Sequence, residues 1–204
     1  LQGRNVALNN TATLGQFMSS HDEDGLLYKL VKADNISEER AKELFKVAAS
    51  LQLTAKGQPV IYYGEEVGQY GADNYPYQTN RYDFDWSLVK DTNVTYQHYK
   101  KLLAIRKTYS TLFARADRSV VAIDDAKGYD VVKRTYNNES LYVAMNLKNE
   151  SQTVALTGLE ANAAYKDVYS GTAYTADANG AVNLVIPASA NGGTAILVKE
   201  VSEA

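Results

Sequence analysis

The spacing of apolar residues changes near residue 114, and this change restricts the folds open to the chain. Before it, short apolar runs alternate with longer segments in which apolar residues recur at the spacing of an amphipathic helix. After it, apolar and polar residues alternate in short stretches separated by turn-forming residues, which is the pattern of half-buried strands. The sequence therefore predicts an α/β domain over residues 1–113 and an all-β domain over residues 114–204.

The first domain contains two segments with helical spacing and two short apolar runs. Helices are expected at about residues 37–54 and 95–109, and strands at residues 13–18 and 59–64. Ser37 is a suitable N-cap because its side chain can accept a hydrogen bond from the first helical turn. The order strand, helix, strand, helix is typical of parallel α/β units, but two strands leave both edges of a parallel sheet open. We therefore expect further strands in a longer parent protein, and apolar edges that favour self-association of this chain.

The second domain reads as a series of short strands. They are expected at residues 119–123, 130–136, 140–147, 152–156, 164–169, 172–176, 181–186 and 194–199. Turn-forming pairs such as Ser170-Gly171 and Asn179-Gly180 separate several of them. This number and spacing of strands predict an antiparallel β-sandwich.

Composition excludes several classes of function. The formal net charge is −3 with no basic run, which argues against nucleic acid or an anionic membrane as a partner. No apolar stretch approaches the roughly 18 residues that cross a bilayer. Cysteine is absent, so disulfides, thiol nucleophiles and zinc–thiolate sites are excluded. The 16 tyrosines, against 4 phenylalanines and 1 tryptophan, suit a sugar-binding surface or an antiparallel sheet with one wet face.

Acidic residues follow both predicted strands of the first domain. The run His21 to Asp24 comes after the first strand, and Glu65 and Glu66 come after the second. The carboxyl ends of parallel strands are where active sites of α/β folds are built. Glycoside hydrolysis uses two carboxyl groups, so the residues alone predict Asp22 paired with Glu65 or Glu66. The alternative is that these acids only cap helices or lie as solvated loop charges.

Other chemistry at these residues is less well supported. The acidic run lacks the spacing of a calcium-binding loop. Ser20, His21 and Asp22 are adjacent on one loop and cannot form a catalytic relay. His98 falls in a helical segment and is expected to be a partly exposed structural residue.

Four segments, taken in order, resemble glycoside hydrolase family 13, the α-amylase family. Residues 17–22, which end in His21-Asp22, resemble its fourth signature region after barrel strand seven. The run from Gly57 to Gly68 is similar to strand eight and the Gly-x-Pro-x-Ile-Tyr-Tyr-Gly-acid-Glu sequence that follows it. Residues 80–86 resemble the family's Arg-containing segment that ends in Trp, and residues 99–107 resemble its eighth helix. The resemblance implies the last two βα units of a (β/α)8 TIM barrel followed by a C-terminal antiparallel β-sandwich.

The resemblance also assigns roles to individual residues. It places the family's nucleophile and general acid on strands four and five, before Leu1, so Asp22 and Glu65 or Glu66 would not be the reacting pair. It makes Asp22 the transition-state stabiliser and His21 a substrate-binding residue. Glu65, Glu66 and Arg81 become supporting residues. It implies no metal site and no cofactor in this chain, with calcium allowed in the complete protein. In one departure, a serine stands before His21-Asp22 where the family commonly has asparagine.

The expected function is that of the C-terminal part of a retaining α-glucan hydrolase acting on α-1,4 or α-1,6 bonds of starch-like polysaccharides. The chain alone is expected to be inactive, and its partners would be the α-glucan and the missing half of the barrel. A transglycosylase or branching enzyme, or a non-catalytic carbohydrate-binding module, remains an alternative. The run from Ser19 to Gly25 is most similar to extracellular bacterial amylases and amylopullulanases, so an extracellular or cell-surface location is expected.

Overall fold

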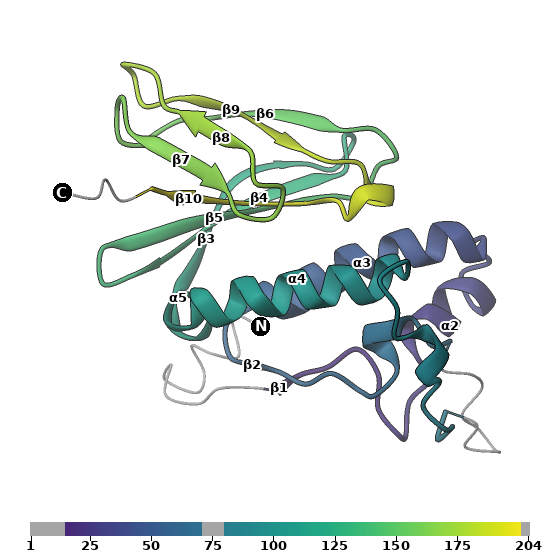
Figure 1. Cartoon of the computed structure of the whole chain (residues 1–204). Helices are drawn as coiled ribbons and strands as arrows, with labels where there is room; N and C mark the ends of the chain where they lie inside the picture. Colours follow the sequence, from purple (N-terminus) through teal and green to yellow (C-terminus); the bar gives the residue numbers. More distant parts are fainter. Residues whose placement is uncertain (1–14, 71–79, 201–204) are drawn as a thin grey trace. The chain divides into compact units, whose positions relative to one another are not determined.

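The computed structural model of the chain describes residues 15–70 and 80–200 (Figure 1). The chain divides into two compact units, Leu1–Ala104 and Ile105–Ala204. The domain boundary that the sequence indicates between residues 113 and 114 stays a prediction. Within the described residues, none of the helices combines the length and apolar character needed to cross a membrane.

The first unit is mainly helical. Its elements in chain order are β1 (Gly15–Gln16), α2 (Leu26–Lys32), α3 (Glu38–Thr54), β2 (Gln58–Pro59), the 3-10 helices η1 (Glu65–Val67) and η2 (Trp86–Leu88), and most of α4 (Val94–Thr108). The two helices predicted from apolar spacing are α3 and α4. Ser37 caps α3 as expected, since its Oγ accepts a hydrogen bond from Arg40 N at 3.3 Å. Helix α2 was not predicted.

The two strands of the first unit pair in parallel, as predicted, but both are short. Gly15 lies opposite Gln58. Residues 13 and 14 of the first predicted strand lie outside the described residues, and the prediction is wrong at residues 17 and 18, which are not in a strand. The second predicted strand, residues 59–64, is wrong beyond Pro59. The N–H of Glu65 bonds to Tyr62 O at 3.1 Å, so the chain turns into η1 instead of extending. A strand needs a hydrogen-bonded neighbour along its length, and among the described residues β1 offers only two positions.

The core of the first unit lies between its helices. Leu27 of α2, Phe45 of α3 and Tyr99 of α4 are buried, and the Phe45 and Tyr99 ring centroids are 6.3 Å apart. His98 is also buried, with Nε2 2.7 Å from Lys46 O, so the expectation that it would be partly exposed is wrong. Burial lowers the pKa of His98 to about 4, which keeps the ring neutral at physiological pH.

The second unit contains every strand predicted for it. They are β3 (Asp117–Asp124), β4 (Tyr129–Tyr136), β5 (Glu139–Asn146), β6 (Gln152–Leu156), β7 (Ala164–Asp167), β8 (Ala173–Thr175), β9 (Val182–Ile186) and β10 (Thr194–Lys199). Helix α5 (Ser110–Arg115) precedes them, and the 3-10 helix η3 (Ser189–Asn191) leads into β10. The strands form a six-stranded antiparallel sheet in the order β3-β4-β5-β10-β7-β8 and a separate β6-β9 pair.

The core of the second unit lies between these two sheets, and Figure 1 shows the β6-β9 pair stacked over the larger sheet. Alternate residues of each strand face inward, for example Val154 and Leu156 of β6, and Leu184 and Ile186 of β9. Tyr142 and Tyr165 belong to the same core. Part of the high tyrosine content therefore serves sheet packing. This arrangement is the predicted β-sandwich.

Candidate active-site loop

The loop between β1 and α2 presents His21 and Asp22 to solvent. The Oγ of Ser20 accepts a hydrogen bond from Asp22 N at 3.1 Å, which closes a tight turn. The Oγ of Ser19 accepts from Leu26 N at 3.3 Å and so ties the loop to the start of α2. The side chains of His21 and Asp22 are 63% and 68% exposed. The turn therefore holds two polar side chains outward on a backbone anchored at both ends.

Arg81 joins this pair from a segment far along the chain. Its Nη2 donates to Asp22 Oδ1 at 3.0 Å, and its Nε donates to the main-chain oxygen of His21 at 3.1 Å. His21 Nε2 lies 3.1 Å from Asp22 Oδ2. Exposed ion pairs of this kind add little to stability, about 0–1 kcal/mol, so their main effect is to orient the carboxylate. The structure thus brings together three of the five residues that the sequence singled out.

Asn80 holds the same loop from beneath. The side chain is 1% exposed, and its Nδ2 donates to Ser20 O at 2.6 Å and to Glu23 O at 2.7 Å. These two carbonyl groups lie on either side of His21-Asp22. Asn80 is not among the predicted site residues, because an asparagine beside an arginine carries no sign that it is buried.

Glu65, at the start of η1, is a buried acid with 4% exposure. Its Oε2 accepts a hydrogen bond from Tyr62 N at 3.2 Å. Burial raises the pKa of Glu65 to about 7, and the neighbouring charge of Glu66 acts in the same direction. The nearby Ser19 side chain and the hydrogen bond from Tyr62 N oppose this rise. Glu65 is therefore a carboxyl group that gains and loses its proton near neutral pH.

Glu66 caps the turn that precedes η1. Its Oε2 accepts from Gly64 N at 2.8 Å. Gly64 has φ of +92°, a conformation that side chains with a Cβ rarely adopt. A Cβ at this position would also lie 3.1 Å from the hydroxyl of Tyr82. A glycine is thus required where the chain turns from β2 towards the two acids.

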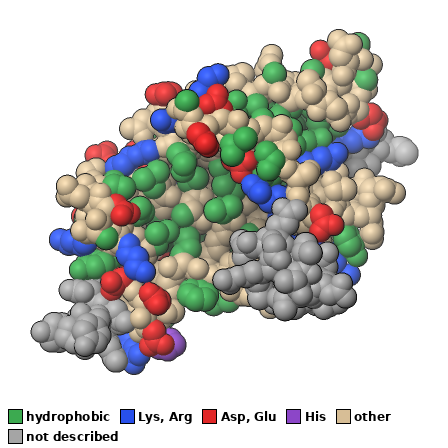
Figure 2. All heavy atoms as spheres, turned by 180° about the vertical axis from the view of Figure 1, so that it is seen from behind, with side chains coloured by type: hydrophobic (Ala, Val, Ile, Leu, Met, Phe, Trp, Pro, Cys, Tyr) green, Lys and Arg blue, Asp and Glu red, His purple; other side chains and the backbone are tan. Residues whose placement is uncertain are grey.

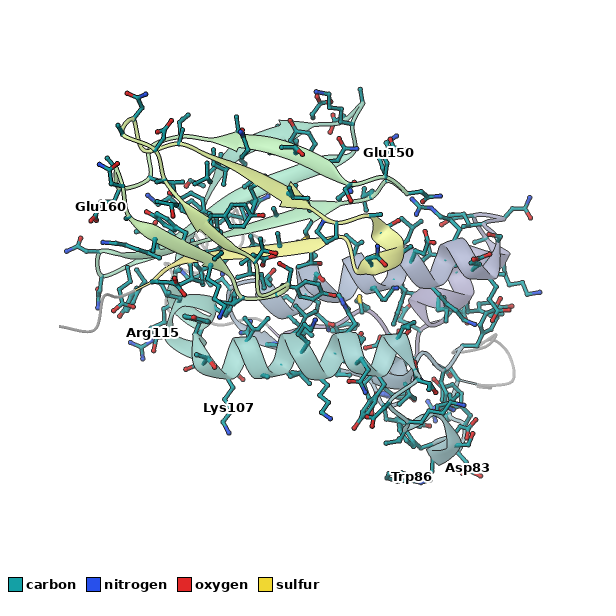
Figure 3. The ribbon with its side chains drawn as sticks, turned by 45° about the horizontal axis from the view of Figure 1, so that its top comes forward. Asp83, Trp86, Lys107, Arg115, Glu150 and Glu160 are labelled. Carbon is teal, nitrogen blue, oxygen red and sulfur yellow. The ribbon has the colours of Figure 1, made fainter. Side chains whose placement is uncertain are left out.

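Aromatic side chains surround this turn and continue to an exposed edge. The ring centroids of Tyr62 and Tyr63 are 4.7 Å apart, and those of Tyr63 and Tyr82 are 5.5 Å apart. Tyr63 also donates its hydroxyl to Tyr82 O at 2.6 Å. Farther along, the tilted rings of Phe84 and Trp86 have centroids 4.7 Å apart, and Trp86 is 77% exposed. Figure 3 shows Trp86 pointing outward. Tyrosine thus packs at this loop as well as in the sandwich core.

The described residues hold no metal-binding cluster. Within residues 15–70 and 80–200, no group of three or more His, Cys, Asp or Glu side chains is placed to bind a metal ion. In Figure 2 an exposed histidine lies beside acidic and basic side chains, an arrangement of mixed charge. The calcium expectation for the complete protein stays a prediction.

Two family models match the chain in order. "Alpha amylase, catalytic domain" matches residues 2–85 and "Alpha-amylase C-terminal domain" matches residues 119–191, so that together they match more than half of the chain. The chain belongs to the α-amylase family, glycoside hydrolase family 13. The family resemblance seen in the sequence is confirmed.

Curated relatives carry names of glucan-acting members of the family. A cyclomaltodextrinase of Geobacillus thermopakistaniensis is 33% identical over 54% of this chain and 18% of its own length. An amylopullulanase of Thermoanaerobacter thermohydrosulfuricus is 31% identical over 78% of this chain and 12% of its own length. The chain therefore spans less than a fifth of these relatives.

Solved structures of family members share the fold. An Anoxybacillus α-amylase superimposes with a TM-score of 0.79 and 23% identity, over all of this chain and 42% of its own. An α-amylase of Geobacillus thermoleovorans, solved in complex with acarbose, gives a TM-score of 0.77 and 24% identity over 97% and 42%. The predicted fold class, a C-terminal part of the (β/α)8 barrel followed by an antiparallel β-sandwich, is confirmed.

Proposed function

We propose that the complete protein is a retaining α-glucan hydrolase that cleaves α-1,4 or α-1,6 bonds of starch-like polysaccharides. The observation that carries the proposal is the Asp22 carboxylate, held by Arg81 and His21 on the exposed loop between β1 and α2. Family membership and the names of the relatives, which include cyclomaltodextrinase, neopullulanase and amylopullulanase, support the substrate class.

In this proposal Asp22 stabilises the transition state. A carboxylate can accept about four hydrogen bonds, so it can hold Arg81 and also accept from sugar hydroxyl groups. Those bonds strengthen as positive charge develops on the sugar ring, which lowers the barrier more than it favours substrate binding. His21 would bind a neighbouring hydroxyl, while Glu65, Glu66 and Arg81 support the loop.

The 204-residue chain alone is expected not to hydrolyse starch or pullulan. The resemblance assigns the nucleophile and general acid to strands outside this chain, and the contacts of Asp22 cannot replace a covalent route. A reducing-sugar assay on the purified chain tests this, and amylase-like turnover would contradict it.

Replacement of Asp22 by asparagine in the complete protein tests the assigned role. Asp22→Asn keeps the size of the side chain but removes its charge, so kcat should fall by more than about a hundredfold, or at least ~3 kcal/mol. KM should change little. Steady-state kinetics and the melting temperature are measured on the same preparation.

The matched control is Glu160→Gln in the sandwich. Glu160 is 64% exposed, similar to Asp22, and pairs with Lys199 at 2.6 Å. Both substitutions should shift the melting temperature by similar small amounts because both pairs are exposed. A near-normal kcat for Asp22→Asn in the folded protein would show that this carboxylate only shapes the loop.

We further propose that the complete protein acts outside the cell or at its surface, and that this chain holds no cofactor. The similarity of the run from Ser19 to Gly25 to extracellular enzymes supports the location. Among the relatives is a protein of Bacillus subtilis named intracellular maltogenic amylase, 29% identical over 70% of this chain. Activity in the medium or washed-cell fraction would support our proposal, and activity confined to the cytosol would contradict it.

A further inference from the structure

A small cavity lies directly beneath the His21-Asp22 loop. Its volume is about 10 Å³, and its polar lining comes from three segments that are distant in sequence. The polar side chains around it include Ser19, Glu23, Tyr62, Glu65, Asn80 and Tyr82. A space of this size accommodates about one water molecule.

Two buried oxygens of residues that line this cavity have no hydrogen-bond partner among the described residues. They are Oε1 of Glu65 and Oδ1 of Asn80, in side chains that are 4% and 1% exposed. An unpartnered buried polar atom destabilises the folded state, so each calls for a partner. A single water molecule can satisfy both, because water donates two hydrogen bonds and also accepts them. Such a bridge persists whether or not the carboxyl group carries a proton.

The opposite ends of the same two side chains hold the backbone. Asn80 Nδ2 donates to the carbonyl oxygens of Ser20 and Glu23, on either side of the exposed pair. Glu65 Oε2 accepts from Tyr62 N and so fixes the turn that follows β2. The loop after β1 and the turn after β2 therefore meet at this cavity.

We propose that Glu65 and Asn80, joined by one enclosed water molecule, are positioning residues that set the orientation of the His21-Asp22 loop. This inference rests on the proposed function only for its kinetic consequence. It assigns these residues a task distinct from substrate contact: they keep the carboxylate of Asp22 where a sugar hydroxyl can meet it. A displacement of about 1 Å at such a group can cost about a hundredfold in rate.

The first experiment compares Asn80→Asp with Asn146→Asp in the complete protein. Asn146 is the matched control: it is fully buried in the sandwich, and its Nδ2 donates to Glu150 O at 2.7 Å and Pro187 O at 3.0 Å. Each substitution removes two bonds to carbonyl groups, so both should lower the melting temperature. Only Asn80→Asp should lower kcat, by roughly tenfold or more. Any change in its KM should be smaller than this factor. Equal effects on kcat, or none from Asn80→Asp, would overturn the inference.

Glu65 is tested by conservative rescue. Glu65→Gln keeps an oxygen for Tyr62 N and a polar group facing the cavity, so it should retain most of the wild-type kcat. Glu65→Ala removes both and should lower kcat as Asn80→Asp does. If either aspartate variant fails to fold, Asn80→Ser and Asn146→Ser make the same comparison without adding a buried acid. Equal activity of Glu65→Gln and Glu65→Ala would overturn the role of Glu65.

Hydrogen exchange gives a readout that does not depend on activity. Exchange at the Asp22 and Glu23 amides should accelerate in Asn80→Asp and Glu65→Ala, and stay at the wild-type rate in Asn146→Asp and Glu65→Gln. Absence of α-glucan hydrolysis by the wild-type protein would contradict the proposed function. The exchange pattern across the four variants would still support the positioning role in that case. Uniform exchange across the four variants would overturn it.

A crystal structure of the wild-type protein tests the bridge itself. One water molecule is expected within hydrogen-bond distance of both Glu65 Oε1 and Asn80 Oδ1. Direct partners from protein groups at both oxygens would overturn the bridge.

Discussion

Asp22 and Glu65 carry the same chemical group in the segments that follow β1 and β2, but their surroundings differ. The Asp22 side chain is 68% exposed and paired with Arg81. Glu65 is 4% exposed, and burial raises its pKa to about 7. The position of an acid after a strand is visible in a sequence, whereas its burial depends on packing against distant segments. This difference favours a role at the sugar for the first acid and a role in the scaffold for the second.

Substitution of Glu65 should change how the stability of the first unit depends on pH. The unfolded side chain ionises near pH 4.5, but the folded one keeps its proton up to about pH 7. Ionisation therefore favours the unfolded state as the pH rises through this window, by about 3 kcal/mol at most. Glu65→Gln removes this loss, so its stability relative to wild type should increase from pH 4.5 to pH 7.

The measurement is denaturant unfolding followed by the fluorescence of Trp86, the single tryptophan of the sequence, which lies in the first unit. Glu160→Gln in the second unit is the control, and it should leave the transition reported by Trp86 as in wild type. A constant difference between Glu65→Gln and wild type across the window would contradict the raised pKa.

At the scale of elements, helices with local signals were predictable and those without were not. Helix α3 has a serine N-cap and two acids, Glu38 and Glu39, in its first turn. Helix α2 has seven residues, no side-chain hydrogen bond at its N-cap Gly25 and no acid in its first turn. Its stability comes from packing, since Leu27 is 1% exposed. Local sequence patterns do not indicate tertiary contacts of this kind.

The candidate site divides in the same way. The motif around His21-Asp22 and the arginine at position 81 were readable because they are short and ordered along the chain. The hydrogen bonds of Asn80 to the loop join residues 57 and 60 positions apart, so no local pattern could announce them. The pattern of residues 59–64 also could not show that this predicted strand ends at Pro59, because the length of a strand depends on the strand with which it pairs.

Asp167 at the end of β7 is expected to be the most sensitive polar residue of its turn. Asp167 is 1% exposed. Its Oδ1 accepts hydrogen bonds from Tyr169 N and Ile196 N, and its Oδ2 accepts from both the N–H and the hydroxyl group of Ser170. Asp167→Asn places an N–H group against a donor, which should cost about 2–3 kcal/mol of stability. Thermal or denaturant unfolding of the second unit measures the effect.

Asp177 provides the control for this prediction. Its Oδ1 also accepts two main-chain hydrogen bonds, from Asn179 N and Ala181 N, but the residue is exposed. Asp177→Asn retains an oxygen for these bonds and should cost less than about 1 kcal/mol. If the two substitutions were equally mild, burial of the Asp167 carboxylate would not govern the stability of the turn.

At the scale of the whole molecule, the two units should differ in their resistance to unfolding. The sandwich has a continuous core between two sheets and long antiparallel ladders, such as the full pairing of β4 with β5. The parallel pair β1-β2 has two residues in each strand, and Phe17 and Val60 beside it are 57% and 51% exposed. Exposed apolar groups of this kind favour self-association.

Hydrogen exchange on this chain should therefore show slow amides in the strands of the second unit. Amides at residues 15–18 and 60–63 should exchange faster, because short pairs with exposed side chains open at low free energy. Native-state exchange read by mass spectrometry or NMR provides the rates. Equal protection of both regions in a monomeric sample would contradict this ranking.

The sandwich was also the part most fully predicted, since strict alternation specifies both strand and buried face.

The burial of His98 between α3 and α4 has a consequence for the proton balance of folding. The unfolded ring binds a proton below about pH 6.5, whereas the folded ring stays neutral down to about pH 4, so folding releases a proton in this window and stability falls as the solution becomes more acidic. Glu65 does the reverse between pH 4.5 and about pH 7: folding takes up a proton. Where the windows overlap, the two exchanges nearly cancel. His98 and Glu65 together should therefore take up or release almost no net proton on folding between pH 4.5 and about pH 6.5, although each titrates far from its ordinary range.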